Sequence, residues 1–127
     1  MIPLLSNYVF SENCKIDSIR KGELRDLLVA TIKGKNLEMI LDVISSLNVF
    51  NEGEEVRVIL SREKPEFTEK DFCAHGYVVT EKKKGDNFVS IISFFGPLLR
   101  IVSADGFLQR VGLKSMDHVY FCVRKNE

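Results

Sequence analysis

The sequence of this 127-residue chain predicts an all-β fold, a small barrel or sandwich of short antiparallel strands. Seven or eight strand-like runs are separated by short turn signals, and several alternate apolar and polar residues with the period of two that half-buried strands show. No stretch has the long 3.6-residue periodicity of an amphipathic helix. The length predicts one domain, residues 1–127, large enough to bury a core without disulfides or metals.

Turn signals divide the first half of the chain into four predicted strands, which span residues 8–19, 27–33, 37–43 and 54–61. The turn Arg20-Lys21-Gly22 closes the first, and Gly34 with Asn36 marks a tight hairpin between the second and third. Two apolar sets each share one strand face: Leu37, Met39, Leu41 and Val43, and then Val56, Val58 and Leu60. Because polar residues alternate with them, these strands are predicted to face the core on one side and water on the other.

The second half continues with a charged segment, residues 61–71, which contains Pro65 and is predicted to be a surface loop. A strand follows over residues 72–80, and Lys82-Lys83-Lys84-Gly85-Asp86 is predicted to be a hairpin tip. Residues 105–117 are predicted to form a connection with one short helical turn around 107–111. The last strand places apolar residues on one face and polar residues on the other: Val119, Phe121 and Val123 against His118, Tyr120 and Arg124.

Between Asp86 and Asp105 lies the run NFVSIISFFGPLLRIVSA, in which Arg100 is the only charge. Its serines, its Gly-Pro pair and its strand-forming residues argue against a membrane-spanning helix. The better interpretation is two strands joined at Gly96-Pro97. Both faces of this hairpin are apolar, so one can line the core and the second needs another cover.

Composition narrows the function classes. Lys and Arg together number 18, as do Asp and Glu, so net charge does not direct the chain toward nucleic acid or membrane. Cys14, Cys73 and Cys122 form no CxxC pair, and an odd number argues against a secreted disulfide framework. The start, MIPLLSNYVF, lacks the features of a signal peptide. We expect a cytoplasmic protein.

The sequence carries no strong motif for catalysis or for cofactor binding. The glycines lack P-loop or GxGxxG spacing, and His75 and His118 lack a metal-binding spacing, so we expect surface histidines, no cofactor and no metal. Cys73 shares a strand face with His75, which would place a thiol beside a base in a small hydrolase. Nothing nearby indicates an oxyanion hole or a third group, and a buried, inert Cys73 thiol is the favoured interpretation.

The lysines at 82–84 raise a second alternative. A basic hairpin tip beside aromatic residues such as Tyr77 and Phe88 is how some oligonucleotide-binding barrels hold single strands. Glu81 and Asp86 flank the lysines and the whole chain is neutral, which favours a solvated turn. A stand-alone module for single-stranded nucleic acid is therefore the alternative function.

Five segments occur in a familiar order and cover Val9 to Lys125: LEMILDV at 37–43, EEVRVILS at 54–61, the strand around HGYV at 75–78, SFFGPLLRIVSAD at 93–105 and HVYFCVRK at 118–125. This order resembles the eighth small subunit shared by eukaryotic nuclear RNA polymerases and its archaeal counterpart, the G subunit. Eukaryotic members carry a long acidic loop in place of REKPEFTEKD, and Gly-Gly-Leu-Leu-Met in place of residues 96–100. The short loop indicates an archaeal member.

The resemblance implies an eight-stranded antiparallel barrel related to the oligonucleotide/oligosaccharide-binding (OB) fold. It also implies a structural and assembly subunit of DNA-directed RNA polymerase that packs against the largest subunit. Such a subunit has no active site of its own, because nucleotidyl transfer belongs to the large subunits and their magnesium ions. Other polymerase subunits are the expected partners. Neither membrane binding nor direct sequence-specific binding of nucleic acid is expected.

The double-faced run supplies the candidate subunit interface, which comprises Phe94, Phe95, Gly96, Pro97, Leu98, Leu99 and Arg100. By alternation Phe94 shares a face with Ile92, and Phe95 shares the other face with Ile91. The pattern does not say which face is inward. We expect one phenylalanine to belong to the core and the other to the docking surface.

Overall fold

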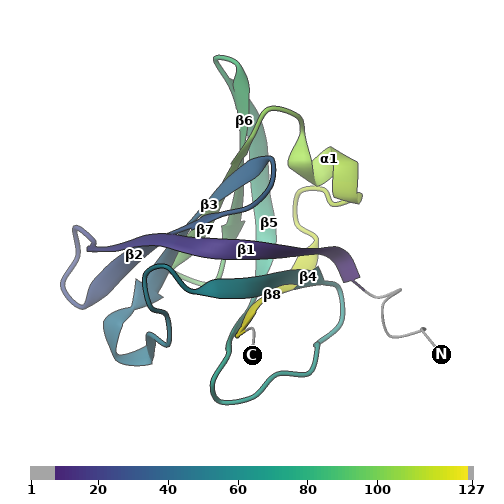
Figure 1. Ribbon diagram of the computed structural model, residues 1–127. Coiled ribbons are helices and arrows are strands. Elements are labelled where there is room, and N and C mark those ends of the chain that lie inside the picture. The colour runs from purple at the N-terminus through teal and green to yellow at the C-terminus, as the bar shows by residue number, and fades with distance from the viewer. Residues whose placement is uncertain (1–7, 126–127) are drawn as a thin grey trace.

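The computed structural model describes residues 8–125, which form a closed antiparallel barrel (Figure 1). Its eight strands are β1 (Tyr8–Lys21), β2 (Leu27–Lys33), β3 (Leu37–Ile44), β4 (Glu55–Ser61), β5 (Phe72–Lys84), β6 (Asn87–Ser93), β7 (Leu98–Ser103) and β8 (His118–Lys125). They lie around the barrel in the order β1-β2-β3-β7-β6-β5-β8-β4, and β4 pairs back onto β1. The all-β prediction is confirmed, and the barrel is consistent with a relation to the OB fold.

Strand ends differ from the prediction at two hairpins. β1 continues through Lys21, so the turn starts at Gly22, and β5 continues through Lys84. The three lysines therefore belong to a strand, with Lys82 opposite Val89, and only Gly85-Asp86 form the tip. At the β5–β6 hairpin, the two-residue connection lets the strands pair up to their last residue. This pairing outweighs the poor strand propensity of consecutive lysines.

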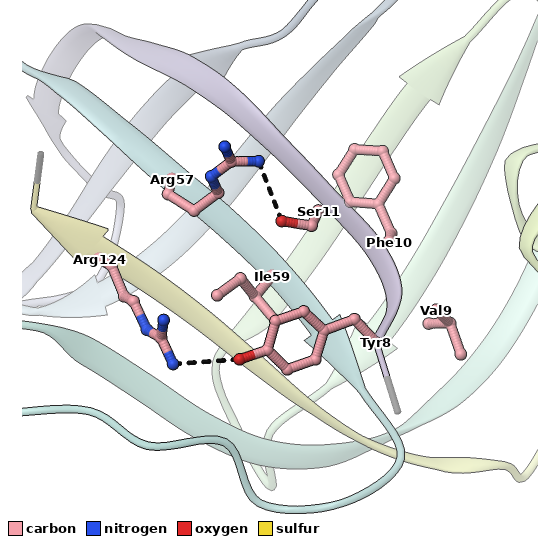
Figure 2. Close-up of a pocket in the computed structure, with 7 residues that line it drawn as sticks. All are labelled: Tyr8, Val9, Phe10, Ser11, Arg57, Ile59 and Arg124. Atoms are coloured by element: carbon pink, nitrogen blue, oxygen red, sulfur yellow. Dashed lines mark hydrogen bonds between the residues drawn. The ribbon is translucent and has the colours of Figure 1, made fainter. Parts of the chain in front are cut away.

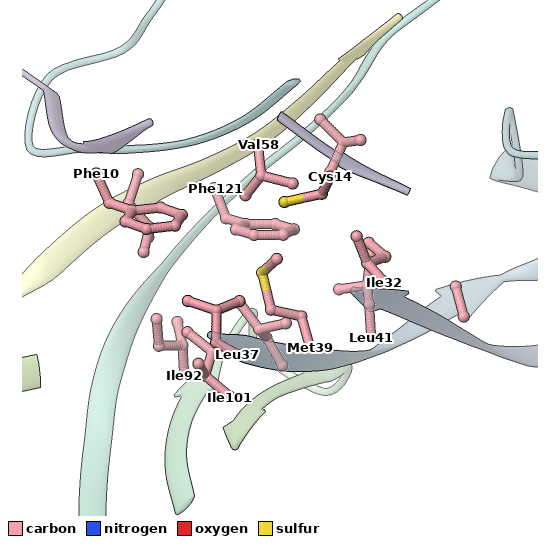
Figure 3. Close-up of a cluster of buried hydrophobic side chains, with 14 of the residues drawn as sticks. Phe10, Cys14, Ile32, Leu37, Met39, Leu41, Val58, Ile92, Ile101 and Phe121 are labelled. Carbon is pink, nitrogen blue, oxygen red and sulfur yellow. The ribbon is translucent and has the colours of Figure 1, made fainter. Parts of the chain in front are cut away.

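The inward faces of the strands fill the barrel with apolar side chains (Figure 3). Both predicted apolar sets are buried there. One barrel end is closed by helix α1 (Phe107–Val111), where Phe107 is fully buried and its ring meets Phe10 at 5.1 Å between centroids. The other end is closed at the β6–β7 turn by Phe94, whose ring centroid lies 6.0 Å from that of Phe121. A short 3-10 helix, η2 (Ser45–Leu47), follows β3.

The cysteines correct one expectation. Cys73 and Cys122 face each other across β5 and β8, with their Cα atoms 4.0 Å apart, and they form a disulfide. Cys73 is therefore not an inert thiol, and the hydrolase hypothesis loses its nucleophile. An odd number of cysteines argued against a framework of several bridges, but strand register can still bring together two cysteines that are 49 residues apart. Cys14 is free, and burial, followed by the charge of Glu12, raises its pKa to about 12, so it is a neutral thiol at pH 7.

Glu81, which the sequence indicated as a charge flanking the lysines, instead connects the barrel to α1. Its Oε2 accepts hydrogen bonds from Ser90 Oγ and from the Leu108 N–H, each at 2.7 Å. Ser90 is fully buried, so this carboxylate supplies the acceptor that its hydroxyl needs.

Replacing Glu81 by alanine is expected to lower the free energy of unfolding by about 1–3 kcal/mol, because two donors lose their acceptor. Urea unfolding of the purified protein measures this effect. Glu81→Gln, which keeps an oxygen at the same place, should lose less. Equal urea midpoints for Glu81→Ala and the parent chain would show that α1 is held without this contact.

Candidate subunit interface

The seven candidate residues all lie at one end of the β6–β7 hairpin. Phe94 donates its N–H to the Pro97 carbonyl at 2.9 Å, which closes a tight turn, and the Phe95 N–H reaches Ser93 Oγ at 3.3 Å. The last three candidates begin β7. The predicted two-strand hairpin joined at Gly96-Pro97 is thus confirmed.

The structure separates the two phenylalanines. Phe94 is half-buried on the same inward side as Ile92 and packs against the core. The Phe95 side chain is 69% exposed at the tip of the turn. The expectation that one of them belongs to the core is confirmed, whereas the docking role of the other is a prediction.

Phe95 also has an unusual backbone. Its φ is 63°, in the left-handed region that bulky residues rarely adopt, and the φ of Gly96 is 135°. Glycine adopts a positive φ without penalty, but for Phe95 the left-handed conformation costs of order 1–3 kcal/mol, and such strained residues concentrate at binding and switch sites. The turn therefore holds a large apolar ring in solvent at an energetic cost, which is typical of a residue that contacts a partner.

Arg100 lies on the outer face of β7, half-buried between two apolar cross-strand neighbours, Ile40 on β3 and Ile91 on β6. No residue in the part of the chain that the structure describes pairs with its guanidinium. Leu99 points the other way and is fully buried in the core. The outer face thus carries an arginine that has no ion pair among residues 8–125, directly between two isoleucines, with Glu38 and Asp42 further along the same face of β3.

A row of rings on the outer face of β5 and β8 continues this surface. His75 stacks on Tyr120 at 4.4 Å between centroids, and Tyr77 lies 6.5 Å from His118 and 5.7 Å from Phe95. Both histidines are exposed, as predicted. Sequence reasoning missed the row because its members come from strands that are far apart in the chain; the alternation of His and Tyr within each strand was the available signal.

Residues 8–125 contain neither a cluster of metal-ligating side chains nor a membrane-spanning helix. In that range no three or more His, Cys, Asp and Glu side chains converge in a way that could hold a metal ion. Neither of the two short helices there has the length and apolar character of a membrane span.

The fold and this surface define a small all-β barrel protein whose outer face carries an aromatic and cationic patch. The sequence pattern of the family of the DNA-directed RNA polymerase G subunit matches residues 9–126. The chain belongs to this family.

Relatives agree with the assignment. The chain is 46% identical over 114 residues to "DNA-directed RNA polymerase subunit Rpo8" of Sulfolobus acidocaldarius, covering 88% of this chain and 94% of that protein. It is 41% identical over 120 residues to the protein of the same name in Saccharolobus solfataricus, covering 90% and 91%. A solved molybdate-binding protein, ModG, has 15% identity and a TM-score of 0.36 over 91% of this chain and 89% of its own, which is too low to support an inference.

Proposed function

We propose that this chain is a non-catalytic structural and assembly subunit of a cytoplasmic archaeal RNA polymerase, and that it docks on the largest subunit through residues 94–100. The observation that carries this proposal is the exposed Phe95 ring in a strained turn. Arg100, on the outer face of β7 just after that turn, adds a charge without an ion pair among residues 8–125. A buried aromatic anchor and a desolvated arginine are the side chains that dominate protein interfaces. The complementary site on the partner is an apolar pocket with a nearby carboxylate.

The barrel's topology limits how a partner can bind. Every strand of a closed barrel has a neighbour on both sides, so a partner cannot add a strand to a free edge. Binding must instead use outward side chains and the exposed turns. The β6–β7 turn offers both.

Nucleic-acid binding by the barrel alone is less well supported. A single-strand site needs cations and aromatic rings along one groove. The lysines and the aromatic row lie at opposite ends of β5: Lys82 pairs with Val89 near the β5–β6 tip, whereas Tyr77 pairs with Ser93 beside the β6–β7 turn. Of the two aromatic residues in that hypothesis, Phe88 lies beside the lysines, opposite Lys83, whereas Tyr77 does not, so the lysines and the aromatic row do not form one groove.

Purification of the tagged chain from native extract tests the proposal. We expect the large polymerase subunits to co-purify at a fixed ratio in high salt. We also expect the free barrel to show no template-dependent nucleotide incorporation. Salt-sensitive binding of single-stranded RNA by the free barrel, without polymerase recovery, would support the alternative function instead.

Arg100→Glu is expected to weaken docking about tenfold, because it places a negative charge opposite the proposed carboxylate. The side chain points outward, so the melting temperature should change little. Titrating the variant into polymerase that lacks this subunit measures the affinity.

The matched control for Arg100→Glu replaces Lys82, Lys83 and Lys84 by alanine. This control removes more positive charge, at the β5–β6 tip and away from the β6–β7 turn. Docking should stay within about twofold of the parent, since exposed charges contribute little. Loss of docking in the lysine variant, with none in Arg100→Glu, would move the interface to the β5–β6 tip.

A further inference from the structure

A cavity of about 580 Å³ lies on the side of the barrel formed by β1, β4 and β8, away from the β6–β7 turn (Figure 2). Two arginines border it, Arg57 from β4 and Arg124 from β8. Ile59 lies between them, and the side chains of Tyr8 and Ser11 complete the polar part of its wall. Cavities of this size are typical of small-ligand sites.

The two arginines are direct cross-strand partners in the β4–β8 register. Like charges directly opposite each other destabilise a sheet unless something neutralises them. Neither guanidinium has a carboxylate within 4.0 Å among residues 8–125. In the described part of the chain, the adjacent strands therefore hold two positive charges against one cavity with no carboxylate in ion-pair contact.

Within residues 8–125, the hydrogen bonds of these guanidiniums go to neutral oxygens. Arg57 donates to Ser11 Oγ at 3.1 Å, and Arg124 donates to the Tyr8 hydroxyl at 3.2 Å and to the Glu66 carbonyl. These contacts orient both side chains and supply no opposite charge. Among residues 8–125, the buried Arg124 Nε has no acceptor, although most buried donors have one.

Asp71 is the carboxylate whose pKa responds to Arg124, although it makes no ion pair with the guanidinium within 4.0 Å. Burial raises its pKa, and hydrogen bonds from the backbone of Thr68 and Lys125, with a smaller effect of Arg124, more than reverse that rise. Its oxygens are occupied by these donors: Oδ2 by Thr68 and Oδ1 by the Lys125 N–H. The Asp71 carboxylate keeps its charge, which partly offsets Arg124, but its hydrogen bonds hold it in the loop before β5 and it is not part of the cavity wall.

We propose that this cavity binds an oxyanion, a phosphate or a carboxylate, between the guanidiniums of Arg57 and Arg124. Planar guanidinium groups bind both classes through paired N–H donors. The Tyr8 and Ser11 hydroxyls keep the two arginines in place, and Ile59 forms an apolar floor beside the anion. The proposal does not depend on the docking surface, because the cavity is on other strands.

The test titrates inorganic phosphate into the full chain at constant ionic strength and follows the arginine side-chain N–H signals by NMR. Saturable shifts of the Arg57 and Arg124 signals are expected. Arg57→Gln should weaken binding about tenfold or more, because it removes one charged donor pair. Arg110→Gln removes the same charge outside the cavity, where Arg110 pairs with Asp105, and should bind phosphate as the parent does.

Two further measurements identify the anion and show whether a variant that binds weakly is still folded. Acetate titrated in the same way distinguishes the sources: tighter phosphate binding assigns a phosphate ligand, and tighter acetate binding assigns a carboxylate from a polypeptide. Arg124→Lys keeps the charge and loses the planar fork, so it should bind phosphate more weakly than the parent while melting near the same temperature. Shifts that do not saturate with either anion, or equal binding by Arg57→Gln and Arg110→Gln, would overturn the proposal.

Discussion

Replacing Phe95 by alanine is expected to release the chain from the polymerase while the free barrel melts at nearly its usual temperature. The Phe95 ring is 69% exposed, so its removal takes little apolar surface out of the core. An interface anchor of this kind contributes about 2 kcal/mol or more to binding, which corresponds to about a thirtyfold loss of affinity. Thermal melting beside co-purification with the large subunits measures both quantities.

Phe94→Ala is the matched variant, because it removes the same ring one residue earlier. Phe94 packs against the core and lies near Phe121, so we expect the free energy of unfolding to fall by about 3 kcal/mol, the lower end of the range for buried phenylalanines. If both variants co-purify with polymerase as the parent does, Phe95 is not the anchor and the interface lies elsewhere. If Phe95→Ala destabilises the barrel as much as Phe94→Ala, the two rings do not have separate roles.

Alternation predicted most of the barrel because strands outside the β6–β7 hairpin have one polar and one buried face. β3 shows this directly, since Leu37, Met39, Leu41 and Val43 are buried and Glu38 and Asp42 point outward. The β6–β7 hairpin was equally predictable, because Gly96-Pro97 interrupts an otherwise continuous strand pattern. These signals are local, and local patterns identify strands better than they identify neighbours.

The features that sequence reasoning missed depend on which strands lie side by side. The Cys73–Cys122 disulfide requires that β5 and β8 pair in one particular register. The Arg57–Arg124 pair depends in the same way on β4 and β8. The positive φ of Phe95 was hidden for a different reason: the turn signal in the sequence is Gly96-Pro97, and bulky residues such as phenylalanine rarely adopt the left-handed region.

Gly76 determines how closely the proposed docking turn packs against β5. It lies on the inward side of β5, where a Cβ atom would overlap the Ser93 carbonyl oxygen and approach Phe94 Cδ1 to 2.7 Å. The absence of a side chain therefore lets the end of β6 and the Phe94 ring pack directly against β5. Since Phe95 follows Phe94 in the same turn, the position of its exposed ring depends on this close approach.

Gly76→Ala is expected to lower the free energy of unfolding by about 3 kcal/mol, the upper part of the usual range for overpacking, because the obstacle is backbone that cannot rotate away. It should also weaken docking, because the displaced turn carries Phe95 with it. Denaturant unfolding measures the first effect and co-purification with the large subunits the second.

Adding Phe94→Ala to Gly76→Ala separates the two sources of overlap at this position. The second change clears space near the ring but not near the Ser93 carbonyl, so the double variant should regain neither stability nor docking. Recovery in the double variant would show that the Phe94 ring alone requires glycine at position 76. Normal docking by the destabilised Gly76→Ala single variant would show that the Phe95 turn is held in place independently of β5.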